Sequence, residues 1–206
     1  MIKKKMLDDE PWIRIQNVVA SASLNHRIDV KAVCKAFPKT EYRPDIFPGL
    51  VFRLETPKTA TLIFNSGKMV CTGAKSEKDS ITAVKSIVSR LKKAKIIIRG
   101  KPEIKIVNIV ASANLGGKVD LYGLIQKCGR DMGGRIMYEP EQFPGLIYRM
   151  EDPKAVILVF ASGKLVCTGA RKEDSLYRSV EKLHQKLDQY NVIMYRTRPK
   201  KRYTLE

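Results

Sequence analysis

The chain has 206 residues and a formal net charge of +18, from 39 Lys and Arg against 21 Asp and Glu. A hydrophobic content of 44% supports a folded core, and no apolar run reaches the length of a membrane-spanning helix. The charged first ten residues lack the apolar centre of a signal peptide, so we expect a soluble, intracellular protein. The excess of cations attracts polyanions, and nucleic acid suits it better than a membrane, because the sequence has no basic amphipathic membrane helix and no lipidation motif.

The chain carries two versions of one sequence. The segment NVVASA at 17–22 returns as NIVASA at 108–113, FPGL at 47–50 returns at 143–146, and SGKMVCTGA at 66–74 returns as SGKLVCTGA at 162–170. The spacing grows from 91 to 96 residues, which indicates a net five-residue insertion in the second copy. Two long copies predict a molecule with pseudo-twofold symmetry that presents one surface twice. We place a charged tail at 1–10, the repeats at 11–99 and 100–193, and a basic tail at 194–206.

Each repeat has the same expected order of elements. A strand (13–22 and 104–113) precedes a short helix (30–36 and 121–127). Three strands follow, at 50–54, 60–64 and 68–72 in the first copy and at 146–150, 156–160 and 164–168 in the second. Ser-Gly pairs at 66–67 and 162–163 predict tight hairpin turns. A longer helix closes each copy, at 78–94 and 175–190, and the terminal segments 1–10 and 196–206 are expected to be mobile.

The predicted strands are apolar on both faces. In the strand at 60–64, alternation puts Leu62 and Phe64 on one face and Ile63 on the other. Two long helices are too few to cover both faces of a sheet of about ten strands, so one apolar face stays uncovered. Exposed apolar patches of this kind usually mark a binding site. The fold class is therefore α+β, with one antiparallel sheet and the helices on one of its faces.

The sequence offers no motif for catalysis. The four cysteines have no Cys-x-x-Cys spacing, so we predict no metal site, no cofactor and no enzyme, with Cys71 and Cys167 buried in strands. Neither Gly67-Lys68 nor Gly117-Lys118 is followed by the Ser or Thr of a phosphate-binding loop. Two alternatives remain open: a nuclease or glycosylase of DNA repair with a similar shape, and a protein-binding adaptor whose sheet face holds another protein.

A basic protein with an apolar sheet face suits the minor groove of DNA. A·T pairs present only acceptors there, and they lack the guanine amino group that a smooth apolar surface would clash with. Asn17 and Asn108 are polar exceptions on the predicted face, and an Asn amide can donate to adenine N3 or thymine O2. Phenylalanines near the edges of the sheet can wedge between base steps and kink the duplex.

The motifs EPEQFPGLIYR at 139–149 and SGKMVCTGAK at 66–75 closely resemble the TATA-binding protein family, and the resemblance covers residues 13 to about 190. It implies a saddle of two pseudo-symmetric halves with a curved sheet below and helices on the convex face. Minor-groove binding and DNA bending are known properties of that family. By motif matching, the intercalating residues are Phe47, Phe64, Phe143 and Phe160. The base contacts are Asn17, Val19, Pro48, Leu62, Val70, Thr72, Asn108, Val110, Pro144, Leu158, Val166 and Thr168. The phosphate contacts are Arg53, Lys58, Ser66, Lys68, Arg149, Lys154, Ser162 and Lys164.

The resemblance also implies partners. They are double-stranded promoter DNA, transcription factor B and the RNA polymerase machinery, with factor B contacting Glu139, Glu141 and Gln142. Self-association of the free protein through its apolar face is an open alternative. The motifs favour an archaeal member, which would act on chromosomal DNA in the cytoplasm, whereas a eukaryotic member would be nuclear. Because the copies are so similar, we expect the protein alone to bind a TATA element in both orientations.

Overall fold

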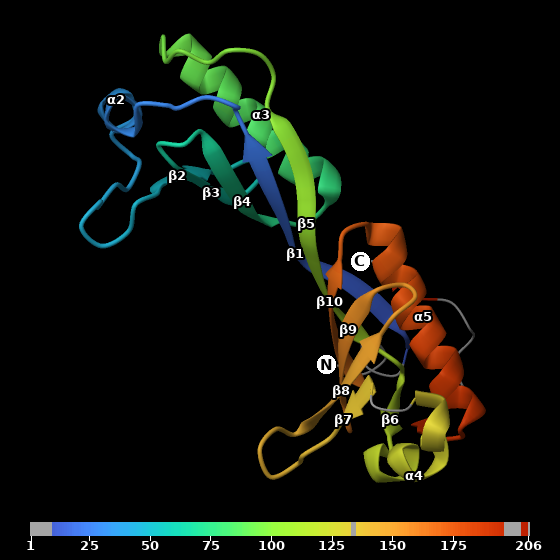
Figure 1. Ribbon diagram of the computed structural model, residues 1–206. Coiled ribbons are helices and arrows are strands. Elements are labelled where there is room, and N and C mark those ends of the chain that lie inside the picture. The colour runs from blue at the N-terminus through green and yellow to red at the C-terminus, as the bar shows by residue number, and fades with distance from the viewer. Residues whose placement is uncertain (1–9, 133–134, 196–202, 206) are drawn as a thin grey trace, which may run out of the picture. The chain divides into compact units, whose positions relative to one another are not determined.

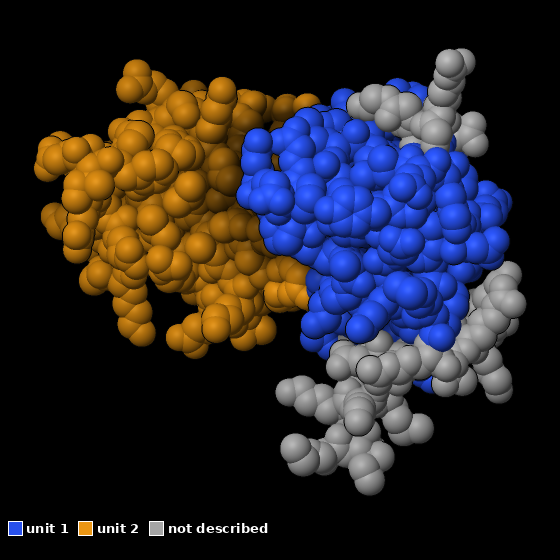
Figure 2. Space-filling model, turned by 90° about the horizontal axis from the view of Figure 1, so that it is seen from below, with its two compact units in different colours: residues 1–15, 109–206 blue, residues 16–108 orange. Residues whose placement is uncertain are grey.

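The structure, a computed structural model, describes residues 10–132, 135–195 and 203–205. The chain forms two compact units, unit 2 with residues 16–108 and unit 1 with residues 1–15 and 109–206 (Figure 2). Two long strands, β1 (Trp12–Ser23) and β5 (Glu103–Asn114), cross the boundary and give residues to both units. The first strand of each sequence repeat is therefore divided between the two compact units.

The main sheet is antiparallel along the order β2-β3-β4-β1-β5-β10-β9-β8-β7 (Figure 1). Its shorter strands in unit 2 are β2 (Leu50–Leu54), β3 (Thr59–Ile63) and β4 (Lys68–Ala74). Those in unit 1 are β7 (Ile136–Met137), β8 (Gly145–Met150), β9 (Ala155–Phe160) and β10 (Lys164–Ala170). Within the described residues, cis peptide bonds occur at Thr56-Pro57 and Asp152-Pro153, in matching turns before β3 and β9.

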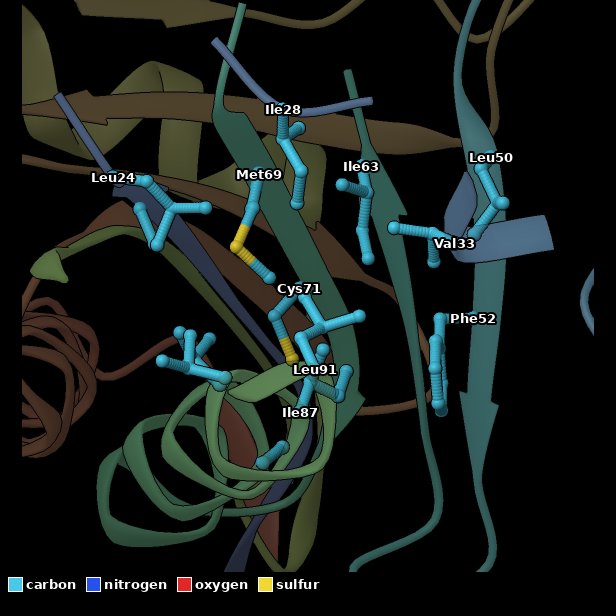
Figure 3. Close-up of a cluster of buried hydrophobic side chains, with 14 of the residues drawn as sticks. Leu24, Ile28, Val33, Leu50, Phe52, Ile63, Met69, Cys71, Ile87 and Leu91 are labelled. Carbon is cyan, nitrogen blue, oxygen red and sulfur yellow. The ribbon is translucent and has the colours of Figure 1, made fainter. Parts of the chain in front are cut away.

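In unit 2, α2 (Val30–Ala36) and α3 (Glu77–Lys93) each begin at a capping side chain. The Asp29 carboxylate accepts a hydrogen bond from the Ala32 N–H (3.1 Å), and the Ser76 hydroxyl accepts one from the Asp79 N–H (3.0 Å). The inner side of α3 packs on β3 and β4 and completes a cluster that includes Met69, Cys71, Ile87 and Leu91 (Figure 3). This cluster occupies the helix-covered face of the sheet.

In unit 1, α4 (Leu121–Met132) and α5 (Glu173–Gln189) have the corresponding roles. Leu176, Val180, Leu183 and Leu187 form the buried side of α5, which packs on β9 and β10. A separate two-stranded sheet joins β6 (Gly117–Val119) to β11 (Ile193–Tyr195). Unit 1 therefore has a helix-covered core of the same construction as unit 2.

The expected α+β class, the antiparallel sheet of about ten strands and the order of the main elements are confirmed. Four short strands (β6, β7, β11 and β12) were not expected from the sequence. The expectation of a mobile C-terminal tail is wrong for Tyr203–Leu205. The pair Thr204–Leu205 forms β12 parallel to Trp12–Ile13, and the Tyr203 hydroxyl hydrogen-bonds to Nδ1 of His184. Residues 1–9, 196–202 and 206 of the predicted tails lie outside the described residues, as do 133–134 in the insertion. Met194 and Tyr195, predicted as the start of the basic tail, belong to β11.

No helix in the described part of the chain is long and apolar enough to cross a membrane. Cys71 and Cys167 are buried, as expected, and burial raises the pKa of the Cys167 thiol to about 12.

Candidate nucleic-acid interface

Every long strand turns one face to the helices and leaves the other partly exposed. In β3 the side chains of Thr59, Thr61 and Ile63 are buried, whereas Ala60 and Leu62 between them are not. Strand register lines up the partly exposed residues into rows. One row in unit 2 runs Val51, Leu62, Val70, Ser21, and its counterpart in unit 1 runs Ile147, Leu158, Val166, Ser112. Each unit thus carries an uncovered, largely apolar strip, which we call the strand face.

A pair of phenylalanines lies beside each strip. In unit 2 the rings of Phe47 and Phe64 meet edge to face with centroids 5.9 Å apart. In unit 1 Phe143 and Phe160 meet at the same 5.9 Å, and Phe47 and Phe143 are 40% and 37% exposed. The remaining two phenylalanines, Phe37 and Phe52, form a third pair that packs in the core of unit 2.

A glycine makes room for each of these two phenylalanine pairs beside the strand faces. A Cβ atom at Gly49 would lie 2.6 Å from Cε1 of Phe47 and 2.9 Å from Cε1 of Phe64. At Gly145 the corresponding distances, to Phe143 and Phe160, are 2.7 and 3.0 Å. Carbon atoms in contact normally stay about 3.5–4.0 Å apart. Only glycine therefore lets the two rings rest on the backbone at the start of the strand, a requirement that the sequence reading missed although both FPGL motifs contain it.

A single helical turn precedes each first phenylalanine. The Phe47 N–H donates to the Arg43 carbonyl and the Phe143 N–H to the Glu139 carbonyl, both over 2.9 Å. Pro48 and Pro144 follow the phenylalanines and are exposed. The same turn therefore leads into the first phenylalanine of the pair in both units.

Asn17 lies on the strand face at a bulge between β1 and β4. The Gly73 N–H donates to its Oδ1 over 2.7 Å, and its Nδ2 donates to the Thr72 hydroxyl over 3.0 Å. Because Oδ1 accepts from the backbone, the amide is oriented with its nitrogen as the donor, and the hydrogen bond to Thr72 uses one of its two N–H groups. Val19 is partly exposed on the same face.

Asn108 and Val110 have the equivalent positions in β5 and are partly exposed. Thr168 lies in β10 beside a matching bulge, between Cys167 and Ala170. The predicted polar centre therefore recurs in the second copy.

The predicted phosphate-binding residues are all exposed, and most follow the same plan in both units. Ser66 and Lys68 flank Gly67 at the tip of the hairpin between β3 and β4, where φ is +80° and a Cβ would lie 1.9 Å from the His26 carbonyl oxygen. Ser162 and Lys164 are the counterparts of Ser66 and Lys68 in unit 1. The other exposed cations of this set are Lys58, its counterpart Lys154, and Arg149.

Arg53 differs from its counterpart Arg149. Its guanidinium Nε lies 3.1 Å from Oε1 of Glu41, and both side chains are about 60% exposed. Met137 stands where unit 1 would need such a carboxylate, and within the described residues Arg149 forms no ion pair. The two strand faces are thus not electrostatically identical at this position.

Glu139, Glu141 and Gln142 are exposed in the turn before Phe143. Their counterparts in the first copy are Arg43, Asp45 and Ile46, so the turn of unit 1 carries the greater negative charge. No group of metal-ligating side chains was found in the described residues.

The family model described as "Transcription factor TFIID (or TATA-binding protein, TBP)" matches residues 12–94 and again 103–190. The chain belongs to the TATA-binding protein family. It is 48% identical over 186 residues to the TATA-box-binding protein of Pyrodictium occultum, covering 90% of this chain and 91% of that one. It is 50% identical to that of Sulfolobus acidocaldarius, with 88% and 92% covered.

The solved structure of Methanococcus jannaschii TBP superposes with a TM-score of 0.73 at 45% sequence identity, over 86% of this chain and 99% of that one. Membership confirms the resemblance found in the motifs, and these relatives are archaeal, as the motifs favoured. It also assigns the chain to a family of transcription factors and not of enzymes.

Proposed function

We propose that this chain recognises promoters by binding the minor groove of a TATA box with its strand faces. The observation that carries the proposal is the partly exposed phenylalanine pair that packs on a glycine beside an uncovered apolar strip, present once in each unit. A core pair would be covered by a helix, as Phe37 and Phe52 are. A partly exposed pair of rings at the edge of an apolar strip fits the wedge that minor-groove proteins insert between base steps, as is known for this family.

The rest of the strand face suits the same ligand. Leu62, Val70, Leu158 and Val166 present a surface without polar atoms, which accepts A·T edges and excludes the guanine amino group. The oriented Asn17 amide supplies a donor for the acceptors that A·T pairs display. Exposed cations around the strip supply phosphate contacts, which set register without reading sequence. Flexible TA steps lower the cost of the bend.

The bent complex then recruits transcription factor B and RNA polymerase. We place factor B on Glu139, Glu141 and Gln142, because the first copy has Arg43 and Ile46 at two of these positions. Replacing Glu139 and Glu141 with Lys should weaken the ternary complex with factor B and leave binding to the TATA duplex intact. Equal loss of both activities would assign these carboxylates to the DNA complex or to folding instead.

A bend-sensitive FRET titration tests the DNA proposal. It compares a short duplex with a central TATA element and a G·C-rich duplex, for the wild type and for the double variant Phe143→Ala, Phe160→Ala. Bending of the TATA duplex alone, lost in the variant, is the expected result. Phe52→Ala serves as the control, because it removes a core ring and should lower the melting temperature without abolishing the bend of the protein that remains folded. Equal, unbent binding to both duplexes would leave the protein only a nonspecific polyanion binder.

A further inference from the structure

The outer side of α3 carries a stripe of lysines. Lys78, Lys85 and Lys92 follow one another at intervals of seven residues, so they lie almost in line along the helix, about 10 Å apart. All three are exposed, and the exposed hydroxyl residues Thr82 and Ser89 lie between them. The side chains that bury α3 against the sheet, such as Val84, Ile87 and Leu91, are on the opposite side of the helix. We call this outer side the lysine stripe.

The equivalent helix of unit 1 has the opposite charge at the same positions. Both α3 and α5 are 17 residues long and begin 96 residues apart. The counterparts of Lys78, Lys85 and Lys92 are Asp174, Glu181 and Asp188. The buried positions of the two helices stay alike, with Val84 matched by Val180 and Leu91 by Leu187. The difference between the helices is therefore concentrated on their outward sides.

The stripe continues into an acid-free stretch. No Asp or Glu occurs between Asp79 and Glu103, and the exposed cations of this stretch include Arg90, Lys93, Lys95, Arg99 and Lys101. Basic residues in a last turn also offset the helix dipole. That role does not account for the stripe, because α5 ends with Lys186 as its one basic residue in the last turn and Lys85 lies in the middle of α3.

The composition of the stripe fits phosphate better than protein. Protein interfaces gather aromatic side chains at their centre and are poor in Lys and Ser. Residues 85–101 contain no Phe, Trp or Tyr, and Ile97 is their one large apolar side chain that is strongly exposed. Lysines alternating with hydroxyls are the residue types that contact the backbone of DNA.

We infer that the lysine stripe of α3 is a second DNA-binding surface, which holds the phosphate backbone of a duplex segment other than the one bound at the strand faces, and that α5 has no such surface. This goes beyond the proposed function, because it places DNA on the helix side of unit 2. It also makes the two units different, although their strand faces are similar, because only α3 would attract DNA. We assign this segment to a second duplex, because the stripe lies on the outer side of α3, away from the strand face of unit 2.

The test first saturates the full chain with a minimal, unlabelled TATA duplex. Fluorescence anisotropy then measures the binding of a labelled G·C-rich duplex at 50 and 200 mM salt. The variant is Lys85→Gln, Lys92→Gln, Lys93→Gln, and the matched control, Arg178→Gln, Lys182→Gln, Lys186→Gln, removes the same charge from α5. Three phosphate contacts contribute a salt slope of about 2.7, or roughly 40-fold in affinity between these salt concentrations. We expect the α3 variant to lose this part of the salt dependence and the control to retain it.

A variant of α5 tests whether lysines on the outer side of such a helix are sufficient for DNA binding. Glu181→Lys, Gln185→Lys, Gln189→Lys introduces lysines on exposed positions of α5 and should create a second site of similar salt dependence. Lengthening the flanks of the TATA duplex distinguishes the two sources of DNA. The expected result is that only the labelled duplex responds to the α3 variant. If affinity for the TATA duplex rises with flank length in the wild type but not in the α3 variant, the stripe holds the flank and the assignment to a second duplex is wrong.

Two results would overturn the inference. One is equal loss in the α3 variant and the α5 control, which would show that net charge alone matters. The other is displacement of the labelled duplex by a poly-glutamate peptide of equal charge as readily as by DNA, which would assign the stripe to an acidic protein. TATA bending by FRET is measured in the same variants and should not change. If the wild type failed to bend the TATA duplex, the proposed function would be refuted, but the anisotropy measurement on the lysine stripe would still stand.

Discussion

Replacing Gly49 with Ala should damage DNA bending far more than folding. The added Cβ would lie 2.6 Å from Cε1 of Phe47 and 2.9 Å from Cε1 of Phe64. To restore ordinary contact distances, the first ring must move by about 1 Å and the second by about 0.6 Å or more. Gly49 does not have a positive φ, so Ala introduces no backbone strain there. The rings can shift into solvent, since Phe47 is already 40% exposed.

The energetic consequence follows from these displacements. The edge-to-face contact of the two rings contributes about 0.5–1.5 kcal/mol, and its partial loss sets the scale of the change in stability. Ala in place of Gly in an extended segment offsets part of this, by about 0.5–1 kcal/mol. The melting temperature should therefore change little. A wedge displaced by 1 Å no longer fits one base step, and we expect a 5- to 20-fold loss of TATA affinity, which is about 1–2 kcal/mol.

The assay combines FRET bending with a double-mutant cycle. If Gly49→Ala acts mainly through the Phe47 ring, then the same substitution in a Phe47→Leu background should cost clearly less, because the nearest ring atom is gone and only Phe64 still has to move. Gly145→Ala should reproduce the effect in unit 1, where the distances are 2.7 and 3.0 Å. Normal bending by the Gly49→Ala protein, or equal costs in both backgrounds, would refute the reasoning.

Four further outcomes are expected. Glu41→Gln frees Arg53 from its exposed ion pair, so DNA affinity at low salt should rise a few-fold and the salt slope should steepen by about 1 in a titration against salt. Ala60→Val enlarges a strand-face residue, and competition binding should show poorer tolerance of a G·C pair with unchanged affinity for pure A·T sites. Thr61→Val removes a buried hydroxyl without a hydrogen-bond partner in the described structure, so urea unfolding should show about 1 kcal/mol more stability. Because burial raises the pKa of Cys167 to about 12, the folded state disfavours its thiolate; stability should fall as pH rises from about 9 towards 12, less so in Cys167→Ala.

Each of these four predictions has an outcome that would contradict it. An unchanged salt slope in Glu41→Gln would mean that the freed guanidinium does not reach phosphate. Equal losses at A·T and G·C sites in Ala60→Val would point to distorted packing, as would lower stability in Thr61→Val. Identical alkaline stability curves with and without the Cys167 thiol would mean that other groups titrate.

The sequence alone determined the repeat and the class of fold, and its resemblance to the TATA-binding protein family supplied most candidate site residues, which stay predictions. Local patterns were sufficient for the repeat and the fold class, because alternation and helical spacing assign faces, and because residues such as Phe47 and Phe143 recur in the same local motif. The bounds of β2 and α2 agree with those read from the sequence, since both are delimited by local turn and capping signals. Short pairings such as β6 with β11 or β12 with β1 depend on partners distant in the chain, and the sequence pattern did not reveal them.

Only the tertiary structure decided which apolar residues form the core and which form the strand face. Phe52 and Phe64 both occur in or beside strands, but α3 and α2 cover the face that carries Phe52 and leave Phe64 beside Phe47. The need for Gly49 became evident from the ring positions, because two distances and not a propensity make a side chain impossible there. Likewise, the Asn17 amide is oriented by the backbone of Gly73, 56 residues away in sequence. Long-range packing and hydrogen bonding fix these features, and a local pattern carries no information about which distant atoms will meet.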